Sequence, residues 1–402
     1  MEAYIIDGIR TPIGSYQGVL SELRADDLGA LVIKAVAERN PEIPLSAYDD
    51  VILGCANQAG DDNRNVARMS LLLAGLPETV PGETVNRLCS SGLSAIIHAN
   101  RAIKAGDGDV FIAGGVENMT RGPLVISKSS KGYGTDSKMY DSSFGWRFVN
   151  PKMKEMHGVD AMGETAENLV EKYNISREDQ DRFALNSQLK AKKAQESGRL
   201  AEEIVNVEIP QRKGDAKVVA QDEFLKPTST IEGLGKLRAA FKKEGSVTAG
   251  NSSGLNDGAA AVIVASADAV KKYNLKPLAR IVSSAVVGVS PRIMGIGPVE
   301  ASNKALAKAG LKMEDMDIIE LNEAFAAQSI ACIREWGLQD DDARINPNGG
   351  AIAIGHPLGV TGARIAYSAA LELNKTQKRY ALVTMCIGVG QGYAAILERF
   401  QA

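Results

Sequence analysis

The sequence lacks the features that mark several classes of protein. Its 402 residues contain no run of the roughly 18–20 apolar residues that a membrane-spanning helix needs, so we expect no association with a membrane. The 46 Lys and Arg are balanced by 49 Asp and Glu, which argues against a nucleic-acid partner, because such proteins usually carry a basic excess. The segment MEAYIIDGIR has no basic stretch leading into an apolar one, so no signal peptide is expected.

Cysteine is also scarce. The chain has 4 cysteines, at Cys55, Cys89, Cys332 and Cys386, without a CxxC pair or the spacing of metal ligands. Disulfides and zinc sites are therefore poorly supported, and we expect no bound metal. The composition favours a reduced, cytoplasmic enzyme.

Short apolar runs alternate with helical spacing along the chain, which is typical of an α/β protein. In the first part we expect strands at 3–7, 50–54, 84–87 and 109–115 and helices at 25–38, 65–73 and 91–104. The second part repeats this order, with strands at 279–286, 317–321 and 380–385 and helices at 300–309 and 362–374. The chain is therefore predicted to contain two copies of one β/α unit.

A segment with a different amino-acid composition separates the two copies. It begins as a loop rich in Gly, Ser and Lys and continues as a charged helical stretch. We expect residues 1–121 and 248–273 to form an N-terminal half, 122–247 an inserted loop domain, and 274–402 a C-terminal half. Insertions between the strands of a rigid sheet commonly carry substrate-binding surfaces.

Cys89 is the first candidate for chemistry, because it lies between a strand-like run and a helix. A thiol at a helix N-terminus is close to the positive end of the helix dipole, which lowers its pKa from about 8.5 and makes it a usable nucleophile. The alternative is a buried cysteine packed under the SSG turn. This motif alone leaves both interpretations open.

A nucleophilic cysteine needs a base, and the chain has only 3 histidines. His98 lies well inside the helix that follows Cys89 and is expected to be packed there, and His157 is expected at a rim or surface of the insertion. His356 holds the place in the second copy that Cys89 holds in the first, at the end of a strand and the start of a helix. If the copies pack about a pseudo-twofold axis, the two helix N-termini meet and His356 faces Cys89.

Two further polar residues end predicted strands. Cys386 follows a buried strand, at the edge where open α/β sheets place their sites, and a second thiol there could exchange a proton with a carbon acid. The alternative is a small buried side chain. Asn322 could hold a water or donate to an oxyanion, or it could be a helix N-cap.

Together, Cys89, NEAF at 322–325, GHPLG at 355–359 and CIGVG at 386–390 resemble the thiolase family, and the resemblance covers the whole chain. It implies a five-layer αβαβα fold with two pseudo-equivalent halves and an inserted loop domain. It also implies an acyltransferase in which Cys89 attacks the 3-keto carbonyl of a 3-oxoacyl-CoA and His356 takes its proton. C–C cleavage then expels an acetyl-CoA enolate that Cys386 protonates, and a second CoA collects the acyl group; the reverse reaction is a Claisen condensation.

The resemblance further implies oxyanion holes and contacts to CoA, which is a substrate rather than a bound cofactor. One oxyanion hole would be a water on Asn322 together with His356 Nε2, and the other the backbone N–H groups of Cys89 and Gly388. The positions that match acyl-CoA contacts of the family are Ser253, Lys226, Phe241, Met162, Ala324 and Phe325. Many biosynthetic thiolases have His where Ala161 precedes Met162, which weakens an assignment to acetoacetyl-CoA.

The segments 54–77 and 144–168 resemble thiolases that act on 3-oxoadipyl-CoA in aromatic degradation. A dicarboxylic acyl chain needs a cation at its distal carboxylate, for which Arg64, Arg147 and Lys152 are candidates; each could instead be a surface or subunit-contact charge. The alternatives are an acetoacetyl-CoA thiolase or a broad 3-ketoacyl-CoA thiolase of fatty-acid β-oxidation. A β-ketoacyl synthase-like enzyme and a non-catalytic CoA-binding protein are more distant. Since the family is usually dimeric or tetrameric, we expect a homodimer or homotetramer, with the loop 124–146 contributing to assembly.

Overall fold

The strands of the protein form one large sheet and two small ribbons in a computed structural model that describes residues 2–401. The strands of the large sheet that precede residue 270 are β1 (Ala3–Arg10), β2 (Gly14–Ser15), β3 (Asp50–Gly54), β4 (Gly82–Val85), β5 (Val110–Asn118) and β10 (Asn256–Ser266). Those that follow are β11 (Ala279–Gly288), β12 (Ile318–Leu321), β13 (Tyr380–Ile387) and β14 (Gln391–Arg399). Their order is β12-β13-β14-β11-β1-β10-β5-β3-β4, with β2 beside β10.

The order and direction of these strands repeat in the two parts of the sheet. In the first part β3 is parallel to β5, and β10 runs antiparallel to both β5 and β1. In the second part β12 is parallel to β13, and β14 runs antiparallel to both β13 and β11. The two parts join through a short pairing of β1 with β11. The predicted repeat of one β/α unit is therefore confirmed.

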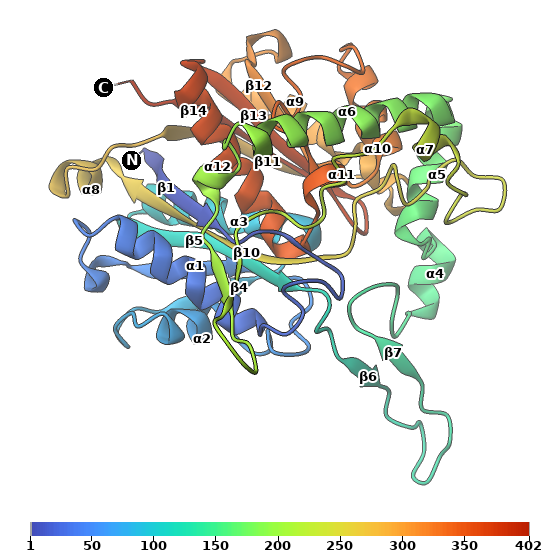
Figure 1. Ribbon diagram of the computed structural model, residues 1–402, viewed down its shortest axis with the longest axis horizontal. Coiled ribbons are helices and arrows are strands. Elements are labelled where there is room, and N and C mark those ends of the chain that lie inside the picture. Colours follow the sequence, from blue (N-terminus) through green and yellow to red (C-terminus); the bar gives the residue numbers. More distant parts are fainter. Residues whose placement is uncertain (1, 402) are drawn as a thin grey trace.

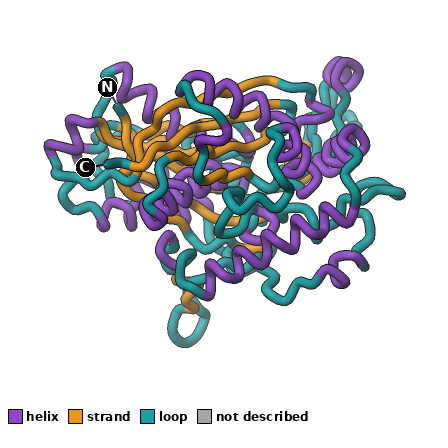
Figure 2. The backbone as a smooth tube through the Cα atoms, turned by 90° about the horizontal axis from the view of Figure 1, so that it is seen from above, coloured by secondary structure: helices purple, strands orange, loops and turns teal. Residues whose placement is uncertain are grey.

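Helices cover the strands in layers. The outer helices of the first half are α1 (Ala25–Arg39) and α2 (Val66–Leu73), and those of the second are α9 (Gly297–Ala309) and α10 (Ala326–Glu335). Between the halves lie α3 (Ser91–Ala105) and α12 (Leu358–Thr376), and α12 contacts strands of both. In Figure 1 the first half (blue to cyan) lies below these central helices and the second half (orange to red) above them. Figure 2 shows the strands grouped inside the molecule with helices around them. The predicted five-layer α/β fold is confirmed.

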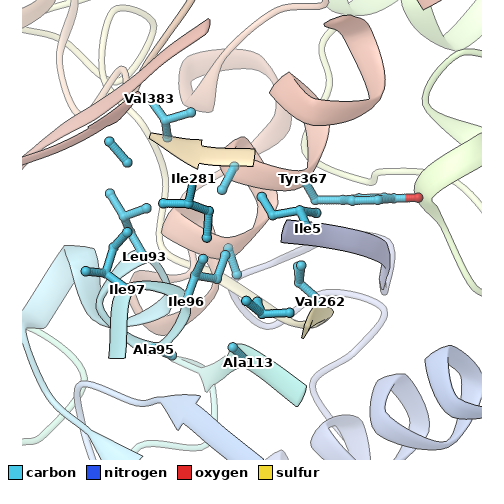
Figure 3. Close-up of a cluster of buried hydrophobic side chains, with 14 of the residues drawn as sticks. Ile5, Leu93, Ala95, Ile96, Ile97, Ala113, Val262, Ile281, Tyr367 and Val383 are labelled. Atoms are coloured by element: carbon cyan, nitrogen blue, oxygen red, sulfur yellow. The ribbon is translucent and has the colours of Figure 1, made fainter. Parts of the chain in front are cut away.

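The core between the halves is built from small and aliphatic side chains. Figure 3 shows Leu93, Ile96 and Ile97 of α3 close to residues of both halves, among them Ala113, Val262, Ile281 and Val383. Gly115 lets α12 approach β5 closely, because a Cβ there would lie 1.8 Å from the carbonyl oxygen of Gly359. The prediction that β5 ends at this glycine is wrong, since the strand continues to Asn118. Gly115 thus serves close packing against α12, and Gly114 serves close packing against β10, because a Cβ on Gly114 would lie 2.0 Å from the carbonyl oxygen of Ala260.

The segment between the halves contains helices and two small ribbons. Its helices are α4 (Pro151–His157), α5 (Met162–Tyr173), α6 (Arg177–Glu196) and α7 (Ile231–Gly235), and its ribbons are β6 (Leu124–Ile126) with β7 (Met139–Asp141) and β8 (Val207–Ile209) with β9 (Lys217–Val219). The predicted opening loop thus contains a β-ribbon, which projects from the body of the molecule (Figure 1). The division of the chain into 1–121 with 248–273, 122–247 and 274–402 stays a prediction.

The remaining helices are short. They are α8 (Ala267–Lys272), α11 (Ala351–Ile354) and the 3₁₀ turns Leu45–Ala47, Leu88–Ser90, Ala201–Glu203, Pro291–Ile296 and Met313–Asp315. Across the described residues, none of the helices combines the length and the apolar character that crossing a bilayer requires.

Candidate active site

The starts of α3 and α12 pack against each other at the centre of the molecule. A Cβ on Gly92 would lie 2.7 Å from the carbonyl oxygen of Gly359, and one on Gly362 would lie 2.4 Å from the backbone nitrogen of Leu93. Only residues without side chains allow helices to approach so closely. The predicted meeting of the two helix N-termini is therefore confirmed, and it brings the segments that carry Cys89 and His356 together.

Cys89 lies in the 3₁₀ turn Leu88–Ser90, directly before α3. The turn is held by Ser91, whose Oγ accepts from the backbone nitrogen of Arg87 (2.8 Å) and donates to the carbonyl oxygen of Leu88 (2.7 Å). Leu88 has a φ of 47°, in the left-handed region that ordinary residues rarely adopt. The half-buried thiol is thus carried on a tightly constrained turn.

The expected low pKa of Cys89 is wrong. Burial raises the pKa of this thiol, because the surrounding protein destabilises the thiolate more than it does the thiol. The backbone N–H groups of Gly388 and of Cys89 itself act in the opposite direction without cancelling this effect. The resting side chain is therefore a protonated thiol, and it needs a base to become a nucleophile.

His356 lies between α11 and α12, and a short helix rather than the predicted strand precedes it. Its Nδ1 is 2.7 Å from the hydroxyl oxygen of Thr361, and that hydroxyl donates to the carbonyl oxygen of Pro357 (3.0 Å). A hydroxyl that donates to a carbonyl accepts from Nδ1–H, so the network assigns the proton to Nδ1 and leaves Nε2 free to accept one. Burial and the nearby Arg364 lower the pKa of His356 to about 3, so the imidazole is neutral at pH 7.

Asn322 follows β12 and reaches toward His356. Its Nδ2 lies 3.4 Å from His356 Nε2, and its buried Oδ1 has no partner among the residues that the structure describes. An unpaired buried carbonyl costs about 1–3 kcal/mol, which marks this oxygen as a place for a ligand or a water. The N-cap interpretation is wrong, because α10 begins at Ala326 with Phe325 at its N-cap.

Cys386 lies near the end of β13 and packs in an apolar cluster with Ala324 and Phe325. Burial raises the pKa of this thiol well above its ordinary value, and the sulfur of Cys89 acts in the same direction. The two sulfurs are thus electrostatic neighbours. Two residues later, Gly388 places its N–H near Cys89, before the left-handed residues Val389 and Gly390 turn the chain into β14.

The predicted acyl-CoA contacts fall into two groups. Most lie around this centre. Ser253 donates its N–H to the carbonyl oxygen of Ala324 (3.0 Å), the rings of Phe241 and Phe325 are 6.1 Å apart, and Met162 Sδ lies 3.7 Å from where a Cβ on Gly388 would be.

Lys226 is farther out. It is exposed, and its Nζ lies 5.7 Å from the ring of Phe224, which packs against Gly254 beside Ser253. Its backbone N–H donates to Gln188 Oε1 (2.9 Å), and Gln188 Nε2 donates to the carbonyl oxygen of Ile352 in α11 (3.1 Å). The structure therefore relates Lys226 to the centre through Phe224 and through Gln188.

The three candidate cations for an acyl carboxylate differ in their surroundings. Arg64 and Lys152 are exposed, and Arg64 lies in a loop with a φ of 62°. Arg147 is half-buried and donates to the carbonyl oxygen of Ser142 (2.8 Å). It alone among the three makes a side-chain hydrogen bond in the described part of the chain.

Several residues that hold the site together could not be predicted from the sequence. Glu117 on β5 accepts from the backbone nitrogens of Ala56 (2.9 Å), Asn57 (3.0 Å) and Gly359 (2.8 Å), so it joins a loop of the first half to the start of α12. Burial raises its pKa to about 7. An acidic residue within an apolar strand was the available signal.

Two other missed residues orient His356 and Asn322. Asn256 accepts the backbone N–H of His356 (2.8 Å). Glu323, the residue after Asn322, accepts from the side chains of Ser187 (2.6 Å) and Asn346 (2.7 Å). These contacts fix the segments that carry the imidazole and the amide.

Glu117 also lies near Cys55 and Asp62. The sulfur of Cys55 and one carboxylate oxygen each of Asp62 and Glu117 all lie within 4.8 Å of one another. Both carboxylates already accept backbone N–H groups, including that of Gly60 on Asp62 (2.8 Å). A metal ion would compete with these hydrogen bonds, so the geometry indicates a structural cluster.

The raised pKa of Cys89 has a measurable consequence. Because only the thiolate reacts with iodoacetamide, the rate of Cys89 alkylation is expected to rise steadily from about pH 7 to about pH 10 without a plateau. The rate can be followed by mass spectrometry of the Cys89 peptide, with Cys89→Ala as the control for the other thiols. A plateau at neutral pH would show that the thiolate is the resting form and would contradict this reading of the site.

Comparison with known proteins places this geometry in a family. Residues 3–268 match the family model described as "Thiolase, N-terminal domain", and residues 275–399 match "Thiolase, C-terminal domain". The chain is 58% identical to the "Beta-ketoadipyl-CoA thiolase" of Acinetobacter baylyi, over 99% of both chains. It is equally similar, with the same coverage, to the "3-oxoadipyl-CoA/3-oxo-5,6-dehydrosuberyl-CoA thiolase" of Escherichia coli. The crystal structure of the Bacillus anthracis acetyl-CoA acetyltransferase is 40% identical and superposes with a TM-score of 0.92, covering 99% of both chains. With both family models matched along nearly its whole length, this chain belongs to the thiolase family.

Proposed function

We propose that this thiolase cleaves 3-oxoadipyl-CoA with CoA to give acetyl-CoA and succinyl-CoA. The observation that supports this substrate best is the 58% identity, over the full length, to two proteins named for 3-oxoadipyl-CoA or its synonym. The acetyl-CoA acetyltransferase of known structure is only 40% identical. Membership of the thiolase family argues against a β-ketoacyl synthase-like enzyme.

The first half-reaction uses Cys89, His356 and Cys386. The neutral imidazole takes the thiol proton on Nε2, and the sulfur attacks C3 of the substrate. The C2–C3 bond then breaks, its electron pair passes to C2 as the enolate of acetyl-CoA, and the Cys386 thiol protonates that carbon. A succinyl group remains on Cys89 as a thioester.

The second half-reaction returns the enzyme to its starting state. The proton on His356 Nε2 first passes to the Cys386 thiolate, which restores both groups. The thiol of a second CoA then loses its proton to His356 Nε2 and attacks the succinyl thioester. The sulfur of Cys89 leaves and takes that proton back from His356, and succinyl-CoA is released. Every step is reversible, so the same residues carry out a Claisen condensation in the other direction.

Two sets of donors are proposed to stabilise the negative oxygens of these steps. One consists of His356 Nε2, once it carries the proton, with Asn322, whose amide lies 3.4 Å away and can hold a water. The other consists of the backbone N–H groups of Gly388 and Cys89, which already point at the Cys89 sulfur. Ser253, Lys226, Phe241, Met162, Ala324 and Phe325 are proposed to contact the acyl-CoA.

The setting of the enzyme is also a proposal. We place it in the cytoplasm, in aromatic-compound degradation, as a homodimer or homotetramer without nucleic-acid or membrane partners. The β6–β7 ribbon supports an assembly role, because its apolar side chains Leu124, Ile126, Tyr133 and Met139 are exposed.

A comparison of three substrates tests the proposed function. Values of kcat/KM are measured for 3-oxoadipyl-CoA, for the neutral 3-oxohexanoyl-CoA of equal chain length and for acetoacetyl-CoA. We expect the highest value for 3-oxoadipyl-CoA. Equal or faster turnover of either neutral substrate would favour an acetoacetyl-CoA thiolase or a broad 3-ketoacyl-CoA thiolase of β-oxidation.

A further inference from the structure

Arg147 carries a positive charge that no acidic side chain of residues 2–401 neutralises by an ion pair. One nitrogen donates to the carbonyl oxygen of Ser142 (2.8 Å), and the other terminal nitrogen lies 3.5 Å from Asn57 Oδ1. Asn57 in turn donates from Nδ2 to the hydroxyl of Ser142 (3.1 Å). A guanidinium has five N–H donors, so these two neutral acceptors orient the group and leave donors free for an anion.

Hydrogen bonds connect Asn57 to both catalytic segments. Its backbone nitrogen donates to Glu117 (3.0 Å), which also accepts from Gly359, three residues after His356. The carbonyl oxygen of the preceding residue, Ala56, accepts from the side chain of Asn86 (3.0 Å).

Asn86 itself belongs to the nucleophile segment. Its Oδ1 accepts the backbone N–H of Leu88 (2.9 Å), the neighbour of Cys89. The loop that orients Arg147 is therefore bonded on one side to the start of α12 and on the other to the turn that carries Cys89.

A second contact approaches the site from another direction. Trp146, next to Arg147, donates from its indole nitrogen to the carbonyl oxygen of Asp160 (3.2 Å), just before α5. Met162 at the start of that helix faces Gly388, whose N–H lies near Cys89. The segment that contains Trp146 and Arg147 is therefore hydrogen-bonded to two different parts of the structure that surrounds Cys89.

From these contacts we infer that Arg147 binds the distal carboxylate of the acyl chain and so selects a dicarboxylic substrate. The inference rests on the proposed function and refines it. A succinyl group is short, so its carboxylate stays close to Cys89 and needs a cation beside the catalytic loops. Arginine suits this role, because its planar fork can donate two parallel hydrogen bonds to one carboxylate.

Substitution of Arg147 tests the inference through substrate selectivity. We expect Arg147→Ala to lower the ratio of kcat/KM for 3-oxoadipyl-CoA over 3-oxohexanoyl-CoA by about 10- to 100-fold, the usual worth of hydrogen bonds to a charged group. Arg147→Lys keeps the charge but loses the fork, so it is expected to give an intermediate ratio. Arg64→Ala and Lys152→Ala serve as matched controls and should leave the ratio within about twofold.

The contrary results are distinct from one another. Equal losses on both substrates would make Arg147 a structural residue, and a selective loss in Arg64→Ala or Lys152→Ala would assign the carboxylate to that side chain; either result overturns the inference. If the unaltered enzyme does not prefer 3-oxoadipyl-CoA, the proposed function itself fails. Should Arg147→Ala not fold, the shift in ratio for Arg147→Lys decides.

Discussion

Cys89→Ala is expected to abolish both cleavage of 3-oxoacyl-CoA and exchange of acyl groups between CoA molecules. In the proposed mechanism both reactions pass through the same thioester on Cys89, so no route remains once the sulfur is gone. The loss in kcat should reach at least about 10⁴-fold, as for other covalent nucleophiles. Cleavage is followed by the fall in enolate absorbance of the 3-oxoacyl-CoA, and exchange by transfer of the acetyl group to isotopically labelled CoA.

A matched control separates chemistry from packing. Cys332 is also buried, and it packs in α10, where its sulfur donates to the carbonyl oxygen of Gly295 (3.3 Å). Cys332→Ala should therefore keep both activities even if it lowers stability. Residual exchange in Cys89→Ala at a rate near that of the unaltered enzyme would contradict an acyl-Cys89 intermediate.

Cys386→Ala is expected to separate the two reactions. Cleavage and condensation need a proton transfer at carbon, so both should fall by about 10²–10⁴-fold, the usual contribution of a general acid or base. Acyl exchange only moves a thioester between Cys89 and CoA, so it should persist at a much smaller loss. The ratio of exchange to cleavage, measured with the same two assays, is the quantity to compare.

An equal loss of both activities in Cys386→Ala would contradict this division of roles. It would mean that Cys386 mainly supports the position of Cys89. Cys386→Ser offers a check, because a hydroxyl fills nearly the same space but is a far weaker acid than a thiol. It should restore packing without restoring cleavage.

Much of the fold could be predicted from the sequence, because its elements follow local patterns. The strand Asp50–Gly54 was predicted with its observed bounds, and α1 within one residue, since apolar runs and helical spacing decide such elements. The predicted bounds are wrong where contacts between residues far apart in the sequence determine how long a strand is. β5 continues past Gly114 and Gly115, where Gly114 allows β10 and Gly115 allows α12 to lie close to the strand, which no local pattern reveals.

The site was predictable to the extent that reactive residue types are rare. With 3 histidines and 4 cysteines, the candidates were few. The repeat paired Cys89 with His356, the end of a strand suggested Cys386, and the resemblance to thiolases implied their roles. The pKa of Cys89 could not be predicted from the sequence in the same way. Helix position suggested a low pKa for Cys89, but burial raises it, and burial depends on the whole fold.

The residues that orient the site could not be identified from the sequence either. Glu117 and Asn256 bind groups that are far along the chain, on Gly359 and His356. Thr361 acts through one hydrogen bond that selects the tautomer of His356. Their residue types occur throughout the sequence. Only the folded structure shows which ones support His356.

The most direct test is to find where the acyl group resides during turnover. The enzyme is mixed with 3-oxoadipyl-CoA in the absence of free CoA, quenched with acid and digested, and its peptides are examined by mass spectrometry. A succinyl group on the Cys89 peptide, removed when CoA is added before the quench, is the expected result. Acylation of Cys386 instead, or no acylated peptide while acetyl-CoA is being released, would contradict a nucleophilic Cys89.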